Sequence, residues 1–143
     1  MDELHGYYFE DISVGMSAVF AKTLTDADVV MFAGVSGDTN PVHLNQLFAE
    51  GTVFKGCVAH GMLSASFIST VLGTRLPGPG CVYLSQSLRF LAPVKVGDTV
   101  VARATVDEID TRKRRVTLET VCKVADTVVV DGQAVVQVSR RPQ

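Results

Sequence analysis

The chain has 143 residues, of which 47% are hydrophobic and 20% are charged, and its formal net charge is −2 at pH 7. This length and apolar content suit one domain with a substantial core, and we expect residues 1–143 to form that domain. Without a basic surplus the chain is not suited to neutralise many phosphates, which excludes nucleic acid as an expected partner.

The first residues, MDELH, carry acids where an export signal would carry lysine or arginine before an apolar stretch. No apolar run approaches the length of a membrane span. Three cysteines, Cys57, Cys81 and Cys122, lack the paired spacing of a zinc site or a disulfide framework, which indicates a reducing compartment. We therefore expect a cytoplasmic protein with no membrane partner, in which the cysteines are small core residues and not nucleophiles.

The first predicted elements are a strand over residues 17–24 and a short helix that begins after Thr25. Thr25 is followed three residues later by Asp28, which is the pattern of a capping box. The glycines at 34 and 37 mark the end of this helix. Apolar residues at helical spacing over 42–49 predict a second short helix, which Gly51 ends.

Residues 61–73 are apolar or small on nearly every side and carry no charge, which predicts a buried helix. Beyond the PGPG segment at 77–80, alternating β-branched residues predict four long strands, over 81–91, 99–109, 115–124 and 128–138. Turn-forming pairs lie at or near the breaks: GD at 97–98, DT at 110–111 and DG at 131–132. Short connections predict an antiparallel meander. The expected class is α+β, a curved antiparallel sheet with the 61–73 helix across its concave face.

Asp38 and His43 lie in the segment SGDTNPVH at residues 36–43, between the two predicted short helices. A carboxylate near an imidazole can hold one water and move protons in both directions, provided that the backbone fixes their geometry. Pro41 and the turn-forming residues around it supply that stiffness. However, an aspartate in such a turn more often only caps it, and a nearby histidine is more often structural. The segment alone therefore does not decide the function.

A second feature favours a catalytic function for this segment. The pair His60-Gly61 stands at the start of the predicted buried helix, where free backbone N–H groups and the helix dipole favour a developing negative charge. An acid, a base and a helix N-terminus are the groups required to add water to an unsaturated carbonyl compound, with the helix end stabilising an enolate oxygen. The same groups would also serve the hydrolysis of a thioester.

The segment FAGVSGDTNPVH at residues 32–43, followed after five residues by Ala49, resembles the signature of the MaoC-like hydratases. The segments YFED at 8–11, VAHGML at 58–63 and FLAPVKVGD at 90–98 extend the resemblance over nearly the whole chain. The resemblance implies a hot-dog fold, a sheet wrapped around a central helix. It further implies a lyase that needs no cofactor or metal and adds water reversibly to a trans-2-enoyl-CoA to give a (3R)-hydroxyacyl-CoA.

The same resemblance implies roles for individual residues. Asp38 and His43 become the catalytic pair. Gly61 becomes the backbone donor to the thioester carbonyl, and Asn40 takes a positioning role. Ser69 aligns with a serine that supports the aspartate in such enzymes, with Ser66 as the alternative.

A single hot-dog repeat has to find its partner half in another chain, so the resemblance also predicts a homodimer. We expect Ile68, Val71 and Leu72 to line an apolar tunnel for the acyl chain. The basic segment TRKRR at 111–115 either grips the phosphates of coenzyme A or is a solvated hairpin tip.

Three other functions stay open on the same fold. The first is a dehydratase that acts on (3R)-hydroxyacyl groups bound to acyl carrier protein. The second is an acyl-CoA thioesterase, in which Asp38 would activate water against the carbonyl carbon. The third is a subunit that binds acyl thioesters without turning them over. A thioesterase rarely needs a histidine so close to the acid, and a subunit that only binds usually lacks both residues, so the sequence favours the hydratase over these two.

Overall fold

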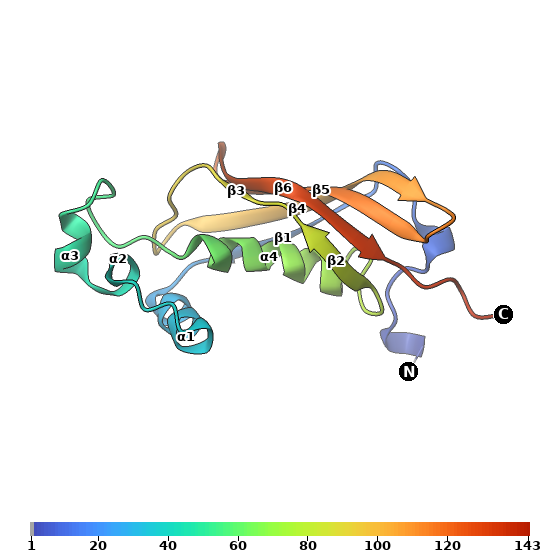
Figure 1. The fold of residues 1–143 in the computed structure, drawn as a ribbon, viewed down its shortest axis with the longest axis horizontal. Helices are drawn as coiled ribbons and strands as arrows, with labels where there is room; N and C mark the ends of the chain where they lie inside the picture. The colour runs from blue at the N-terminus through green and yellow to red at the C-terminus, as the bar shows by residue number, and fades with distance from the viewer. Residues whose placement is uncertain (1) are drawn as a thin grey trace.

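The computed structural model describes residues 2–143, and its largest element is a six-stranded antiparallel sheet. The strands are β1 (Ser17–Thr23), β2 (Val82–Gln86), β3 (Arg89–Phe90), β4 (Thr99–Asp110), β5 (Arg115–Val124) and β6 (Thr127–Gln137). Their order across the sheet is β1-β4-β5-β6-β2, and β3 also pairs with β6. The three long C-terminal strands therefore form the predicted meander, and the sheet curves around helix α4 (Gly61–Thr74) as Figure 1 shows.

The predicted place of the first meander strand is wrong. Residues 81–91 form two short strands, β2 and β3, and both pair with β6 and not with β4. Residues 91–98 carry the chain to the other side of the sheet, where residues 99–105 of β4 pair with β1. The two edges of the sheet within the described residues are therefore β1 and β2.

Helix α1 (Asp26–Ser36) begins and ends as the sequence predicts. The Thr25 hydroxyl accepts the N–H of Asp28 at 3.2 Å, and the Asp28 carboxylate accepts the N–H of Thr25 at 2.9 Å, which together form the capping box. The Thr25 N–H bond is the main reason that the pKa of Asp28 is lowered. Gly37 ends the helix with φ of 77°, a left-handed conformation that glycine adopts without a steric penalty.

The single helix predicted over 42–49 is instead two short helices, α2 (Pro41–Leu44) and α3 (Gln46–Glu50). Asn45 has an extended backbone, with φ of −118° and ψ of 104°, and interrupts the helical run. Its side chain accepts the N–H of Phe48 at 2.9 Å, so that Asn45 caps the start of α3. An asparagine at this position competes with the helix for backbone hydrogen bonds, which the apolar spacing alone does not reveal.

Helix α4 lies across the concave face of the sheet and supplies the centre of the core (Figure 1). Ile68, Val71 and Leu72 are at most 1% exposed and belong to one continuous cluster with side chains of the sheet. Their predicted role as the lining of an acyl tunnel is wrong, because these side chains are occupied in packing the helix onto the sheet. The prediction failed because burial in a core and the lining of an apolar pocket demand the same residue types.

Replacing Leu72 by alanine should lower the free energy of unfolding by about 2–5 kcal/mol, because the cavity cannot close fully in a packed core. Urea unfolding at one fixed protein concentration measures the change. Leu4→Ala is the matched control, since Leu4 is 66% exposed and should change the free energy by less than about 0.5 kcal/mol. Equal losses in the two variants would contradict the placement of α4.

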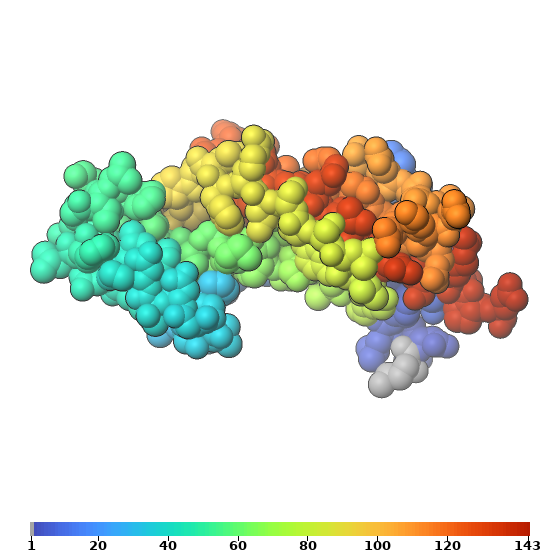
Figure 2. Space-filling model, viewed as in Figure 1, coloured from blue at the N-terminus to red at the C-terminus, as the bar shows by residue number. Residues whose placement is uncertain are grey.

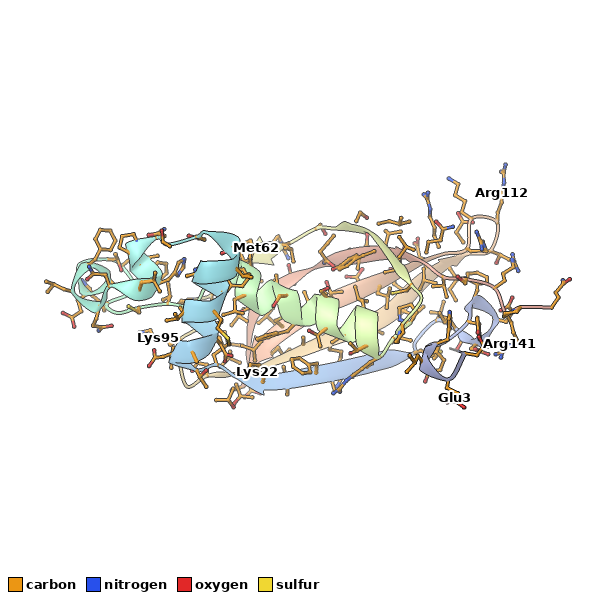
Figure 3. All side chains as sticks on the ribbon, turned by 90° about the horizontal axis from the view of Figure 1, so that it is seen from below. Glu3, Lys22, Met62, Lys95, Arg112 and Arg141 are labelled. Carbon is orange, nitrogen blue, oxygen red and sulfur yellow. The ribbon has the colours of Figure 1, made fainter. Side chains whose placement is uncertain are left out.

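The side of α4 that faces away from the sheet is only partly covered. Its residues Met62 and Ser69 are exposed, and Met62 reaches 55%. Atoms of α4 remain visible below the sheet in Figure 2, and in Figure 3 the helix lies in front of the sheet. Among residues 2–143, no helix combines the length and the apolar character needed to cross a membrane.

The cysteines are free thiols and are unlike one another in burial. Cys122 is 0% exposed, and burial raises the pKa of its thiol to about 12. Burial also raises the pKa of Cys81. A thiol with a raised pKa is a poor nucleophile, so the expectation that these two residues act as packing side chains agrees with their surroundings.

Candidate active site

Asp38 directly follows the left-handed turn at Gly37, in the loop between α1 and α2. Its backbone N–H donates to the Ser36 hydroxyl at 3.1 Å, and its carboxylate oxygen Oδ1 accepts the N–H of Asn40 at 3.3 Å. Both bonds reach only two residues along the chain. They close the turn and direct the exposed carboxylate, as short aspartate side chains commonly do in turns.

Asn40 and Pro41 start the helix that carries His43. The Asn40 side chain accepts the N–H of Val42 at 3.1 Å, and Pro41 occupies the first helical position, where its missing N–H has no cost. His43 then lies in the last turn of α2. This local geometry gives Asn40 a structural reason for the positioning role that the sequence predicted, although it does not test a role toward substrate.

His43 is half-buried and is held by a bond between its ring nitrogen Nδ1 and the carbonyl oxygen of Val58, at 2.7 Å. A carbonyl oxygen only accepts, so Nδ1 carries the proton. In a neutral ring the other nitrogen, Nε2, then has a free lone pair. His43 is therefore oriented to accept a proton through Nε2.

One ligand atom from each of Asp38, His43 and His60 lies within 4.8 Å of the other two. Two hydrogen bonds of about 2.8 Å each can meet at one water molecule over such a separation. The structure thus brings Asp38 and His43 close enough to share one water. It adds the side chain of His60, which the sequence analysis considered only as part of a helix start.

The same three side chains have the residue types of a metal site, but their geometry does not suit one. The rings of His43 and His60 stack with centroids 3.8 Å apart and an angle of 27° between their planes. Two rings stacked in this way cannot both direct an in-plane lone pair at one ion about 2.1 Å away. The cluster is better arranged to hold a hydrogen-bonded water.

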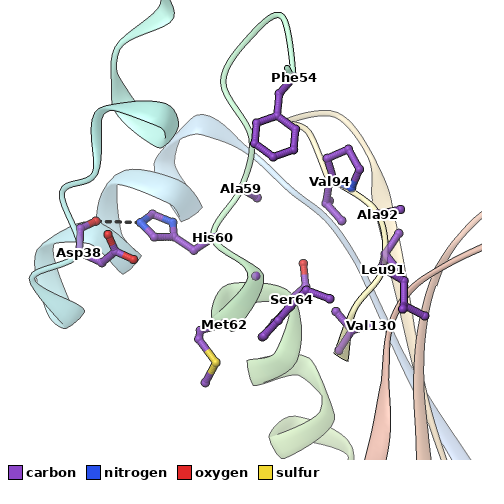
Figure 4. Close-up of a pocket in the computed structure, with 14 residues that line it drawn as sticks. Asp38, Phe54, Ala59, His60, Met62, Ser64, Leu91, Ala92, Val94 and Val130 are labelled. Atoms are coloured by element: carbon purple, nitrogen blue, oxygen red, sulfur yellow. Dashed lines mark hydrogen bonds between the residues drawn. The ribbon is translucent and has the colours of Figure 1, made fainter. Parts of the chain in front are cut away.

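A pocket of about 420 Å³ opens beside Asp38 and His60 and continues along the start of α4 (Figure 4). Its polar wall is Asp38, His60, Gly61 and Ser64, and the rest is mostly apolar. The apolar lining is Phe54, Ala59, Met62, Phe90, Leu91, Ala92, Pro93, Val94, Val129 and Val130. These residues, and not the core residues of α4, are the candidates for contact with an apolar chain.

Gly61 is the first residue of α4, so its N–H has no carbonyl one turn back within the helix. The ring of Phe90 packs over its Cα: a Cβ added at this position would lie 2.6 Å from Cδ1 of Phe90. A side chain at this position would displace the Phe90 ring, and the glycine combines an N–H that is free of the helix with a wall of the pocket. This arrangement agrees with the predicted backbone donor without testing it.

Ser69 and Ser66 lie elsewhere. Both line a separate groove of about 500 Å³ between α4 and β2, which shares Met62 with the pocket but not Asp38. Within residues 2–143, no hydrogen bond joins either serine to Asp38; the Ser66 hydroxyl donates to the carbonyl of Leu63 at 2.5 Å. The structure of the single chain does not bring Ser69 to the aspartate, and its supporting role remains a prediction.

Ser64 is the polar residue of the pocket that the sequence analysis missed. It is 1% exposed, and its hydroxyl has no hydrogen-bond partner among the described protein atoms. In Figure 4 the oxygen points away from the helix axis into the pocket. A small residue in a helix full of small residues gave no signal of its own, because its place in the pocket wall depends on how the start of α4 packs in three dimensions.

Ser64→Ala should raise the free energy of unfolding by on the order of 1 kcal/mol, since it removes a buried hydroxyl that the protein leaves unpaired. Ser66→Ala is the matched control on the same helix, and should lower it because the Ser66 hydroxyl is paired with the carbonyl of Leu63. Chemical unfolding of both variants checks the sign of each change. A loss at Ser64 as large as that at Ser66 would show that the protein supplies a partner.

The basic hairpin tip between β4 and β5 lies far from this pocket. In Figure 3, Arg112 stands at one end of the molecule, well away from Met62, which lines the pocket. Within one chain the tip is therefore a solvated turn and does not reach the site. Of the two readings of the TRKRR segment, the structure favours the solvated one.

The sheet, the central helix and the Asp38–His43 loop are also the parts that known proteins share with this chain. The model of the MaoC like domain matches residues 12–130, a range that contains the loop, the start of α4 and the pocket-lining strands. The chain belongs to the MaoC-like family. The family assignment made from the sequence segments is thereby confirmed.

Curated MaoC-like relatives match over almost their whole length. An (R)-specific enoyl-CoA hydratase of Rhodospirillum rubrum is 56% identical over 140 residues, which cover 98% of this chain and 97% of the relative. A 3-hydroxybutyryl-CoA dehydratase of Methylorubrum extorquens is 47% identical over 143 residues, covering 100% of this chain and 91% of the relative.

Among solved structures, an unliganded R-hydratase of Pseudomonas aeruginosa superimposes with a TM-score of 0.90. It is 40% identical, and the match covers 96% of this chain and 89% of that one. This MaoC-like chain therefore has the hot-dog fold, as the sequence predicted.

Proposed function

We propose that this protein is a lyase that adds water reversibly to a trans-2-enoyl-CoA and gives a (3R)-hydroxyacyl-CoA. The observation that carries the proposal is the spacing of Asp38 and His43, whose ligand atoms lie within 4.8 Å beside the N-terminus of α4. The names of the two curated relatives support the reaction, because hydration and dehydration are the two directions of one equilibrium. Both names also specify CoA, which supports the carrier.

The geometry suggests how the reaction would proceed. The Asp38 carboxylate and Nε2 of His43 share one water, and one of them takes a proton as the water oxygen bonds to the β-carbon. The electrons of the double bond move toward the thioester carbonyl, whose oxygen becomes negative. The free N–H of Gly61 and the dipole of α4 stabilise this enolate oxygen. The pair then delivers a proton to the α-carbon, which completes the addition of H and OH.

The reaction is tested with purified protein and crotonyl-CoA, by following the loss of the enoyl thioester absorbance and determining the chirality of the product. The proposal expects (3R)-3-hydroxybutyryl-CoA. Release of free coenzyme A thiol, trapped with a disulfide dye, would instead reveal a thioesterase. Tight binding of acyl-CoA without turnover would indicate a subunit that only binds.

A separate assay decides whether the acyl group of the substrate is carried by coenzyme A or by acyl carrier protein. We propose coenzyme A, because the names of both curated relatives given above specify CoA thioesters. Crotonyl groups on coenzyme A and on acyl carrier protein are assayed side by side, and a clear excess of kcat/KM for the protein-bound substrate would assign the chain to acyl carrier protein. The same assays across chain lengths define the acyl group that the pocket accepts.

We also propose that the active form is a homodimer in which a second copy covers the β2 edge and the exposed side of α4. Val82, Tyr83 and Leu84 of β2 are 55%, 39% and 41% exposed, an unusual apolar exposure for the edge of a sheet. The groove beneath them is lined by small residues of α4, including Ser66 and Ser69, which allow close approach of another chain. A two-fold pairing would cover both features at once.

Light scattering during size-exclusion chromatography tests the dimer. Leu84→Arg should yield monomers, whereas Leu4→Arg, at another exposed leucine, should leave the mass unchanged. A wild-type chain that stays monomeric at all concentrations would overturn this part of the proposal.

The hydration balances with water alone, so we propose that no cofactor is required beyond the coenzyme A of the substrate. Three free thiols suit a reducing compartment, and we propose a cytoplasmic location on that basis.

A further inference from the structure

His60 is the one buried titratable side chain at the site to which the proposed reaction assigns no role. It precedes α4 as its N-cap and is 2% exposed. Its ring lies between two others: the Phe32 ring of α1, at 4.8 Å between centroids, and the His43 ring of α2, at 3.8 Å. One side chain thus contacts the two helices that flank the Asp38 loop.

The ring of His60 also holds the backbone of Asp38. Nε2 lies 2.9 Å from the Asp38 carbonyl oxygen, and since a carbonyl only accepts, Nε2 carries the proton (Figure 4). The other hydrogen bonds of Asp38 among the described residues reach only two positions along the chain, to Ser36 and Asn40. Those bonds shape the turn, and among the hydrogen bonds of Asp38 in residues 2–143 the one from His60 links the turn to the start of α4.

The stack on His43 fixes the second member of the pair. Stacked aromatic rings contribute on the order of 1 kcal/mol beyond their burial, and they restrict the tilt of each other. The Val58 carbonyl already holds Nδ1 of His43, so the stack with His60 removes the remaining freedom of the ring to swing. Through two contacts, a single ring therefore touches both the backbone of Asp38 and the ring of His43.

We propose that His60 is a positioning residue: its Nε2–H holds the Asp38 backbone and its ring holds His43, so that both side chains can share one water. This inference rests on the proposed hydration. An aromatic residue that only filled space would need the contact with Phe32 but not the bond to Asp38. The two roles can therefore be separated by substitution.

The test compares His60→Gln with His60→Asn. The amide nitrogen of glutamine reaches about as far as Nε2 and can still donate to the Asp38 carbonyl, whereas that of asparagine ends near the position of Nδ1 and cannot. Both variants lose the ring. With crotonyl-CoA we expect the asparagine variant to lose about 100-fold in kcat at a nearly unchanged KM, the effect of a misplacement of about 1 Å. The glutamine variant should regain about tenfold of that loss.

Thermal unfolding of both variants shows whether they remain folded. Equal kcat values for the two folded variants, or values near that of the wild type, would overturn the positioning role. Should the variants not fold, ¹⁵N NMR of the histidine rings in the wild type provides the test. His60 must be the Nε2–H tautomer with a slowly exchanging proton, and the opposite tautomer overturns the inference.

The failure of the proposed function can be told from the failure of this inference. A wild type that is inactive on every enoyl thioester would reject the proposed function. An active wild type whose His60 variants keep the same kcat would reject only the role of His60.

Discussion

Asp38→Asn should lower kcat for the hydration of crotonyl-CoA by about 10²–10⁴-fold, the usual contribution of a positioned proton-transfer group. Asparagine has nearly the same shape, and its amide oxygen can still accept the N–H of Asn40 that closes the turn. What it loses is the capacity to take up and return a proton. The substitution therefore removes the chemistry while keeping the loop.

The matched control for this variant is Asp126→Asn. Asp126 is an exposed acid in the turn between β5 and β6, so the control makes the same change of charge away from the pocket. It should keep the kcat of the wild type. The two variants should also unfold at similar temperatures, because neither side chain is buried. A near-normal kcat in Asp38→Asn would show that water is activated elsewhere.

The parts of the fold that the sequence predicted are those that local signals determine. The capping box of Thr25 and Asp28 and the left-handed Gly37 bound α1 as expected, because each is a bond or a backbone conformation formed within a few residues. The run at 61–73 was recognised as the central helix from its composition alone. The loop that carries Asp38 lies between two such locally determined elements.

Pairing across the sheet was not predictable in the same way. The segment that forms β2 and β3 was expected beside β4, but which strands become neighbours depends on the packing of both faces and not on the order of the chain. The Asp131-Gly132 pair was expected near a strand break, yet Gly132 lies inside β6. A Cβ there would come within 1.8 Å of the Ser87 carbonyl oxygen, so the glycine permits close approach of the segment between β2 and β3.

At the site, sequence reasoning found the acid and the base but not what fixes them. Asp38 and His43 belong to one short segment, so their proximity follows from the turn. The bond from His60 ends on a backbone carbonyl 22 residues earlier, and a carbonyl carries no residue-type signal. Ser64 was missed for a related reason, since a serine in a helix is usually bonded to the preceding turn.

His43→Gln should lower kcat by a similar factor of about 10²–10⁴, because glutamine offers no lone pair on a nitrogen at the position of Nε2. His5→Gln is the control: His5 stacks on Tyr8 at the N-terminal end of the chain and lines none of the pockets around α2 and α4. Its kcat should equal that of the wild type. A His43→Gln enzyme that keeps its activity would assign both proton transfers to Asp38 alone.

The double variant Asp38→Asn with His43→Gln is the sharper test of a shared water. Two groups that act on one bound water fail together, so the double variant should be little worse than either single variant. Two groups that contributed independently to the same transition state would instead give losses that multiply, a further fall of about 10²-fold or more. Because the ligand atoms of the two residues lie within 4.8 Å, we expect the first result, measured as kcat under saturating crotonyl-CoA.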